Sequence, residues 1–198
     1  EAQWALLEPA LREVVRVLKP GANIFISEGW RGIFPLKAIL DDNEGLTFFN
    51  MLVWHRPNAM PPLRAKAMSV FWWSNEFILF YRKKGKALYF DYDYAIRNKF
   101  IRGLFTVAKN NVPGHPSVKP LKLWEPLIAI GCPPGGVVLD PFGGSGTTAV
   151  AAKLSGRRAI VIEQSAEYCE LARRRLAQDN MGLLVPGDDA NTGDIHRA

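Results

Sequence analysis

A short apolar strand that runs directly into a glycine-rich turn and a helix is the feature that most constrains this chain. Residues 137–140 read as the strand, and a helix is expected from about 146 to 155. Glycines permit a tight turn and let a ligand approach the backbone without meeting a Cβ atom. The candidate turn residues are Asp140, Pro141, Phe142, Gly143, Gly144, Ser145, Gly146, Thr147 and Thr148.

The same alternation continues to the end of the patterned region. A second apolar strand is expected at 159–163 and a helix at about 166–178, so the last third predicts a parallel, doubly wound arrangement. Glu163 ends this strand roughly 20 residues after Asp140, an offset at which a carboxylate accepts hydrogen bonds from ribose hydroxyls. The turn has neither Gly-Lys-[Ser/Thr] nor Gly-x-Gly-x-x-Gly, which argues against a nucleotide triphosphate or a dinucleotide.

The earlier part of the chain predicts a mixture of helices and strands. Apolar residues at helical spacing indicate a helix from Trp4 to Leu18, which Lys19, Pro20 and Gly21 end. A strand at 23–27, a helix at 35–40 and a helix at 120–130 are also expected. Residues 47–54 and 70–82 are rich in aromatic and β-branched side chains and predict an antiparallel strand pair.

The positive charge of the chain is concentrated in its middle. Residues 51–124 hold 13 Lys and Arg against three Asp and Glu, a net charge of +10, whereas the rest of the chain has a net charge of −4. The same segment carries 14 of the 22 aromatic residues. Cations neutralise phosphates and aromatic rings stack on bases, so this pattern favours nucleic acid, although a solvated basic face over an aromatic core explains charge alone equally well. Residues 83–114 lack periodicity and are expected to form a basic surface insertion.

Composition bears on the number of domains, on metal sites and on membrane spans. With 48% hydrophobic and 22% charged residues, the chain is expected to fold as a single domain over residues 1–198. Two cysteines and three scattered histidines have no metal-ligand spacing, so no metal site is expected. No apolar run approaches the roughly 20 residues that cross a bilayer, and the predicted location is the cytoplasm, with no membrane partner.

Five sequence segments together resemble the amino-group DNA methyltransferases with the β-type order of motifs. They are LKPG at 18–21, WHRPN at 54–58, NEFILF at 75–80, HPSVKP at 115–120 and DPFGGSGTT at 140–148. The resemblance extends from about residue 4 to residue 178. It implies an α/β fold with a doubly wound, mostly parallel sheet of the S-adenosylmethionine-dependent methyltransferase type, in which the antiparallel pair lies at an edge.

The resemblance also implies a cofactor and a substrate. S-adenosylmethionine would donate a methyl group to adenine N6 or, less favoured, cytosine N4 in duplex DNA. Ser117 and Lys119 would meet the carboxylate of the cofactor, Asp140 its ammonium group and Glu163 its ribose, while Phe142 would lie in the pocket. The other implied cofactor residues are the remaining turn residues, Gln164 and His115, of which His115 is a turn residue rather than a proton shuttle.

DNA would contact the basic segment 83–114 and two residues within WHRPN, Arg56 and Asn58. The residues predicted to bind DNA are Arg56, Asn58, Lys83, Lys84, Lys86, Arg97, Lys99 and Arg102. A homodimer is among the expected assemblies.

The [Asp/Asn/Ser]-Pro-Pro-[Tyr/Phe/Trp] motif that holds the target base in this family is missing. The two Pro-Pro pairs, at 61–62 and 133–134, have other neighbours, so the catalytic residues are unassigned. In the β-type order the motif would precede Glu1, and we expect a domain that is incomplete at its amino-terminal end. The alternatives are a catalytically inactive module that binds S-adenosylmethionine or nucleic acid, and a methyltransferase that acts on RNA or a small molecule.

Overall fold

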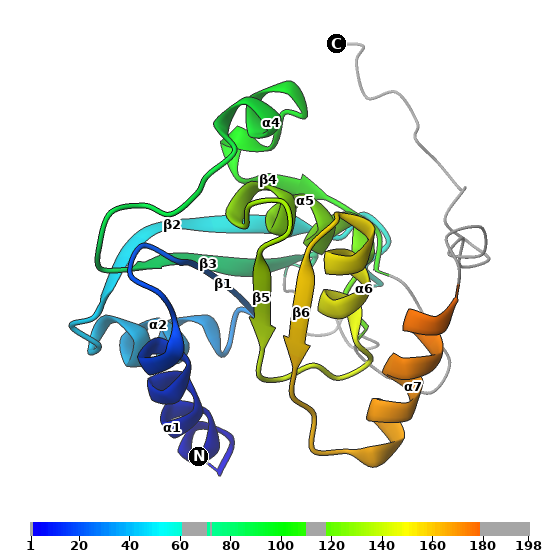
Figure 1. Cartoon of the computed structure of the whole chain (residues 1–198), viewed down its shortest axis with the longest axis horizontal. Coiled ribbons are helices and arrows are strands. Elements are labelled where there is room, and N and C mark those ends of the chain that lie inside the picture. Colours follow the sequence, from blue (N-terminus) through cyan, green and yellow to red (C-terminus); the bar gives the residue numbers. More distant parts are fainter. Residues whose placement is uncertain (1, 61–70, 72, 110–117, 179–198) are drawn as a thin grey trace.

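The chain folds around two sheets with helices packed against them (Figure 1). The computed structural model describes residues 2–60, 71, 73–109 and 118–178. His115 and Ser117 therefore lie outside the described residues, as does the segment after residue 178.

The larger sheet has four strands in the order β1-β3-β2-β4. These are β1 (Asn23–Glu28), β3 (Asn75–Lys83), β2 (Leu46–His55) and β4 (Leu104–Thr106). β3 is antiparallel to both β1 and β2, and β4 is parallel to β2. The antiparallel pairing of β2 with β3 is confirmed. The expected place of this pair at an edge of the sheet is wrong, because β1 pairs with the outer side of β3 and β4 pairs with the outer side of β2.

The last third matches the predicted pattern. β5 (Val137–Asp140) and β6 (Arg158–Val161) are parallel neighbours, and α6 (Thr147–Leu154) connects them. α7 (Ala166–Ala177) follows β6. Because both strands run the same way, Asp140 and the residues after Val161 lie at one edge of the small sheet.

Helices cover both faces of the four-stranded sheet. α1 (Ala2–Val17) and α2 (Ile33–Asp41) pack with Leu79 on one face, whereas α5 (Leu121–Gly131) packs with Ile78 on the other. These adjacent residues of β3 are both fully buried, as expected when successive side chains point to opposite faces. The four-stranded sheet therefore separates these two parts of the core, and a third cluster lies between α5, α6 and the small sheet.

The described part of segment 83–114, residues 83–109, is only partly a surface element. It forms α4 (Tyr92–Arg97), whose first turn is capped by the Asp91 side chain, a short 3-10 turn at Phe100–Arg102, and β4. Phe105 in β4 is 2% exposed and belongs to the core. The expectation of an irregular insertion is wrong here, because a strand of three residues is too short to show alternation in the sequence.

Candidate functional site

The glycine-rich turn joins β5 to α6 through contacts that exclude side chains. A Cβ atom on Gly143 would lie 2.0 Å from Cγ1 of Val161, and one on Gly146 would lie 2.6 Å from Cβ of Ala172. Gly146 also has a φ of 79°, which disfavours other residues. The amide of Gly143 donates to the carbonyl of Ile162 at 2.9 Å. The glycines thus let the turn lie directly against β6 and α7.

Glu163 and Asp140 both hold this turn with their carboxylates. Oε2 of Glu163 accepts a hydrogen bond from the amide of Gly144 at 2.8 Å, and Oε1 accepts one from the amide of Ser165 at 2.8 Å. Oδ1 of Asp140 accepts from the amide of Phe142 at 3.0 Å, and the Asp140 carbonyl accepts from Ile162 at 2.9 Å. Two acidic side chains therefore lie at one edge of the sheet, where the two parallel strands end.

Other predicted turn residues divide into exposed and buried groups. The Phe142 side chain is 53% exposed, while Ser145 and Thr147 are 4% and 6% exposed. The guanidinium of Arg175 donates from Nη1 to the carbonyl and Oγ of Ser145, at 2.7 and 2.8 Å, and to Oγ1 of Thr147 at 3.2 Å. Burial lowers the pKa of Arg175. Sequence reasoning missed Arg175, because its position in α7 carries no local signal of this contact.

Lys119 lies close to the turn, but its side chain has a protein partner. Its Nζ is 2.5 Å from Oε2 of Glu76, and its carbonyl accepts a hydrogen bond from Oγ1 of Thr147 at 3.1 Å. Arg56 binds the other oxygen of Glu76, from Nη1 at 3.2 Å. Both cations lie over the ring of Trp54, at 5.9 Å for Arg56 and 5.4 Å for Lys119. We call Trp54, Arg56, Glu76 and Lys119 the Glu76 cluster.

The Glu76 cluster connects the turn to the loop after β2. Nη2 of Arg56 donates to the carbonyl of Trp73 at 2.7 Å, while its Nε has no hydrogen-bond partner within the described part of the chain. Asn58, two residues further on, exchanges hydrogen bonds with the backbone of Lys109 at 3.0 and 2.9 Å. Sequence reasoning did not identify Glu76 as a functional residue, although NEFILF was among the segments that carried the resemblance.

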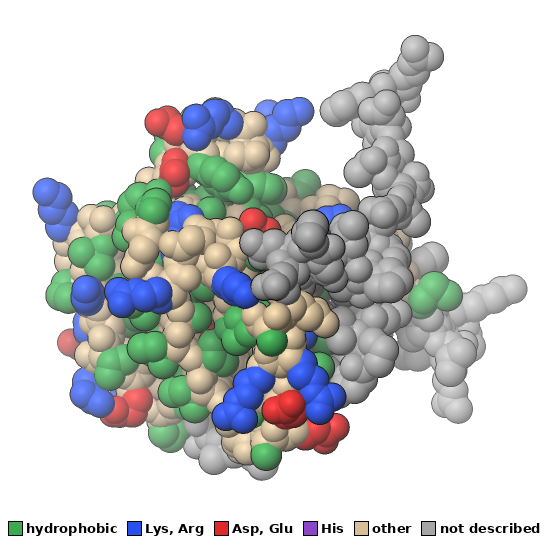
Figure 2. All heavy atoms as spheres, turned by 45° about the vertical axis from the view of Figure 1, so that its right-hand side comes forward, with side chains coloured by type: hydrophobic (Ala, Val, Ile, Leu, Met, Phe, Trp, Pro, Cys, Tyr) green, Lys and Arg blue, Asp and Glu red, His purple; other side chains and the backbone are tan. Residues whose placement is uncertain are grey.

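The predicted DNA-binding residues do not gather in one place. Arg56 and Asn58 lie at the carboxyl end of β2, whereas Lys83 and Lys84 lie at the opposite end of the sheet, where β3 ends. Lys86 is exposed in the loop that follows β3. Figure 2 shows basic side chains spread over its face, with one group on the α4 segment at the top. Exposed basic side chains in and after α4 are Arg97, Lys99 and Arg102.

Lys83 has a structural role that its position in a basic run did not indicate. Its Nζ donates to the carbonyls of Leu18, Val15 and Arg16, at 2.6, 2.7 and 3.3 Å. These carbonyls belong to the carboxyl-terminal end of α1, which attracts cations. The three donors of the ammonium group are thereby used within the protein, which argues against a contact between Lys83 and a DNA phosphate.

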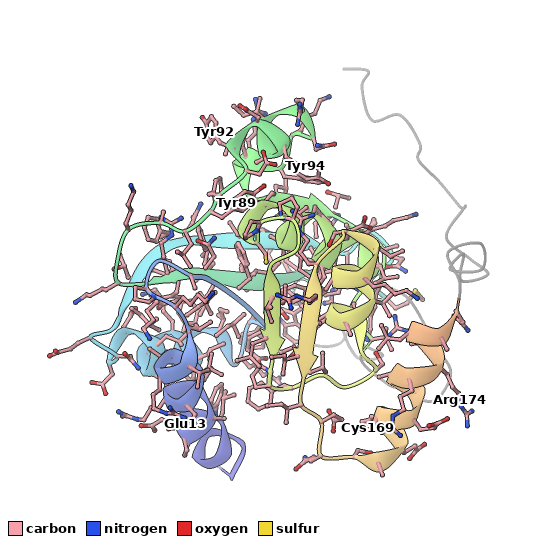
Figure 3. All side chains as sticks on the ribbon, in the orientation of Figure 1. Glu13, Tyr89, Tyr92, Tyr94, Cys169 and Arg174 are labelled. Carbon is pink, nitrogen blue, oxygen red and sulfur yellow. The ribbon has the colours of Figure 1, made fainter. Side chains whose placement is uncertain are left out.

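Tyrosines add aromatic surface near α4. Figure 3 shows Tyr89, Tyr92 and Tyr94 around this helix, far from Cys169 on α7. Tyr92 is 56% exposed, while Tyr94 lies 6.3 Å from Phe100 between ring centroids. The hydroxyl of Tyr89 donates to Asp91 at 3.2 Å. Tyr92 is thus the most accessible of the three.

Among the described residues, the helices are too short or too polar to span a bilayer. No group of three or more His, Cys, Asp and Glu side chains with the geometry of a metal site occurs in the part of the chain that the structure covers.

Comparison with known proteins shows the family. The N6_N4_Mtase model, described as DNA methylase, matches residues 1–174, and the chain belongs to this family. It is 33% identical over 180 residues to the Type II methyltransferase M2.DpnII of Streptococcus pneumoniae, covering 86% of this chain and 66% of that protein. It is 34% identical over 169 residues to M2.MboI of Moraxella bovis, covering 81% and 60%. The chain thus spans somewhat less than two-thirds of the length of these relatives.

Solved structures agree on the fold. The M1.HpyAVI–SAM complex matches with a TM-score of 0.76 at 28% identity, covering 90% of this chain and 85% of the other. TTHA0409 of Thermus thermophilus, in its complex with S-adenosyl-L-methionine, matches with a TM-score of 0.67 at 29% identity, covering 87% and 76%. PvuII DNA methyltransferase, cytosine-N4-specific, matches with a TM-score of 0.74 at 21% identity, covering 84% of this chain and 68% of the other. The chain therefore has the predicted α/β methyltransferase fold.

Proposed function

We propose that this chain contributes the cofactor site and much of the DNA-binding surface of a DNA methyltransferase. The reaction is transfer of a methyl group from S-adenosylmethionine to the exocyclic amino group of adenine or, less favoured, cytosine. The observation that carries the proposal is the glycine-rich turn with Asp140 and Glu163 at the ends of two adjacent parallel strands. Family membership and likeness to S-adenosylmethionine complexes support the same reading.

The residues at the turn fit this cofactor in their chemistry. Carboxylates suit an ammonium group and sugar hydroxyls, and a carboxylate offers about four acceptor sites, more than the one amide that Asp140 binds and the two that Glu163 binds. The exposed ring of Phe142 offers an apolar wall. Gln164 is exposed beside Glu163. When bound, S-adenosylmethionine supplies a methyl group activated by the sulfonium charge, and these side chains bind and orient it.

For duplex DNA, we retain Arg56 and the exposed Lys84, Lys86, Arg97, Lys99 and Arg102 as phosphate contacts. The net charge of +10 on residues 51–124 supports this assignment. Each phosphate contact releases about 0.9 of a counterion, so affinity should fall as salt rises. Asn58 holds the backbone of Lys109 and would shape the loop rather than bind a phosphate.

The groups that hold the target amino group are not assigned to any residue of this chain. We propose that an [Asp/Asn/Ser]-Pro-Pro-[Tyr/Phe/Trp] motif outside residues 1–198 supplies them, because no such motif occurs within the sequence. The same observation favours a second candidate, a catalytically inactive module that binds S-adenosylmethionine or nucleic acid. Action on bacterial DNA would place the protein in the cytoplasm, and a homodimer remains part of the proposal, to be checked by sedimentation.

Calorimetric titration with S-adenosylmethionine and its demethylated product tests the cofactor assignment. Both ligands should bind, and Glu163→Gln should weaken their binding. Glu167→Gln is the control and should leave binding unchanged, because Glu167 is an exposed carboxylate on the first turn of α7. Preferential binding of NAD or ATP would contradict the assignment.

Transfer of a tritiated methyl group to mixed genomic DNA separates the two candidate functions. Residues 1–198 alone should transfer little, because positioning of the amino nitrogen contributes several kcal/mol. A longer chain that carries the motif should restore transfer, and replacing the aromatic residue of that motif should reduce it again. Robust transfer by residues 1–198 alone would show that a group within this chain holds the target base.

A further inference from the structure

Two tryptophans stack on each other at the molecular surface. The ring centroids of Trp30 and Trp73 are 5.1 Å apart and their planes differ by 16°. They remain 41% and 39% exposed. A stacked pair that serves only the core would be buried, so this arrangement presents aromatic surface to an occupant.

Arg31 completes the stack with a positive charge. Its guanidinium carbon lies 5.0 Å from the ring centroid of Trp30 and 5.7 Å from that of Trp73. None of the ion pairs formed by the described residues includes Arg31. An arginine that forms no ion pair with the described carboxylates, beside two partly exposed rings, is complementary to a ligand that is both flat and anionic. We call Trp30, Arg31 and Trp73 the Trp30 stack.

The Trp30 stack lies at the end of the sheet that faces the cofactor turn. Trp30 follows the carboxyl end of β1, and Trp73 precedes the amino end of β3, which pairs with the carboxyl end of β2. The carbonyl of Trp73 accepts the hydrogen bond from Arg56, which binds Glu76. Lys119 then connects Glu76 to Thr147 at the start of α6. An unbroken series of contacts thus joins the stack to the turn.

We propose that the Trp30 stack is a platform on which a nucleobase outside the DNA duplex stacks. The inference rests on the proposed function, in which an enzyme reaches a base only after that base has left the duplex. Every base has an aromatic face, so tryptophan rings accept any of them, and Arg31 can neutralise the adjacent phosphate. Neither tryptophan belongs to an [Asp/Asn/Ser]-Pro-Pro-[Tyr/Phe/Trp] sequence.

Duplexes with and without one bulged 2-aminopurine test the platform. The full 198-residue chain should bind the bulged duplex roughly tenfold more tightly than the paired duplex, since the bulge removes the cost of unstacking. Trp30→Ala and Trp73→Ala should lose most of this preference, while Trp30→Phe and Trp73→Phe should retain much of it. Stacking should also quench the 2-aminopurine fluorescence of the wild-type complex, and the alanine variants should lose this quenching.

Phe49→Ala is the matched control. Phe49 is 50% exposed and has the guanidinium of Arg82 4.5 Å from its ring centroid, but it lies towards the opposite end of the sheet. The Phe49→Ala variant should prefer the bulged duplex as strongly as the wild type does. Melting temperatures identify any variant that fails to fold, in which case the phenylalanine variants carry the test.

The outcomes distinguish this inference from the proposed function. If the wild type binds S-adenosylmethionine and paired DNA but shows no preference for the bulge, or if folded Trp30→Ala and Trp73→Ala keep that preference, the platform is wrong and the proposed function stands. If neither duplex and neither cofactor form binds, both are wrong. Equal loss in Phe49→Ala would also overturn the assignment to the Trp30 stack.

Discussion

Nζ of Lys119 lies 2.5 Å from Oε2 of Glu76. The ammonium group that the family resemblance paired with the cofactor carboxylate is thus paired with a carboxylate of the protein. The side chain of Glu76 is only 14% exposed and also binds Arg56. One anion therefore balances two cations beside the fully buried ring of Trp54. Any role of Lys119 in cofactor binding has to act together with this ion pair.

Glu76→Gln should destabilise the fold markedly. The change leaves Arg56 and Lys119 close together without a counter-charge, and loss of one partner from a largely buried pair costs about 2–3 kcal/mol. Urea unfolding should show a lower midpoint at an unchanged slope. Glu170→Gln is the control, because the Glu170–Arg174 pair is exposed and should contribute less than about 0.5 kcal/mol. Equal effects of the two substitutions would contradict a buried role for Glu76.

Gly143→Ala should distort the turn. The new Cβ would lie 2.0 Å from Val161, and overpacking of this kind costs about 1–3 kcal/mol. Affinity for S-adenosylmethionine should fall together with stability. Gly29→Ala should alter neither, since among the described residues no atom beyond its two chain neighbours lies within 4 Å of the added Cβ. Calorimetric titration and thermal melting of both variants measure these effects, and normal cofactor affinity in Gly143→Ala would show that the turn tolerates a side chain.

Lys83→Met and Lys84→Met should separate stability from DNA binding. Lys83 bonds the last carbonyls of α1, so its loss should reduce the free energy of unfolding by about 1–3 kcal/mol. Its effect on DNA affinity, measured by fluorescence anisotropy in low salt, should be small. Lys84→Met should leave stability unchanged and weaken DNA binding. The reverse pattern would return Lys83 to the set of phosphate contacts.

Tyr81→Phe should change stability in a manner that depends on pH. The buried hydroxyl of Tyr81 donates to Oδ1 of Asp41 at 2.6 Å. Burial acts to raise the pKa of Asp41, but hydrogen bonds from Lys37 and Tyr81 outweigh it and lower the pKa. A lowered carboxyl pKa stabilises the fold above the unfolded value of about 3.9, and this contribution is lost as pH falls through the folded value. The substitution should therefore cost about 1 kcal/mol at pH 7 and less below about pH 4.

Alkaline pH provides the second part of this test. Burial, followed by the contact with Asp41, raises the pKa of Tyr81 well above its ordinary value. The unfolded chain then loses this proton first, and the fold loses stability as pH rises above about 10. Tyr81→Phe should remove the part of this stability loss that comes from ionisation of the Tyr81 hydroxyl. Urea unfolding at pH 3.5, 7 and 11 measures both changes, and a difference from wild type that is constant with pH would contradict the contact.

Local signals in the sequence determined most of the elements. Apolar spacing, together with Lys19, Pro20 and Gly21 after the first helix, predicted α1 and its end, and the alternation after residue 136 predicted β5, α6, β6 and α7. The glycine-rich turn and the two carboxylates beside it were also readable, because these features depend on neighbouring residues and on parallel strands ending at one edge.

Only the tertiary structure decided the partners of the charged residues and the position of the central strand. Glu76 and Lys119 are 43 positions apart, and Lys83 and Leu18 are 65 positions apart, so no local pattern links them. The insertion of β3 between β1 and β2 likewise depends on pairing between distant segments. Lys83 lies in a basic run that favoured DNA, yet its ammonium group is bound more favourably by the carbonyl end of α1, because the fold brings that helix end to it.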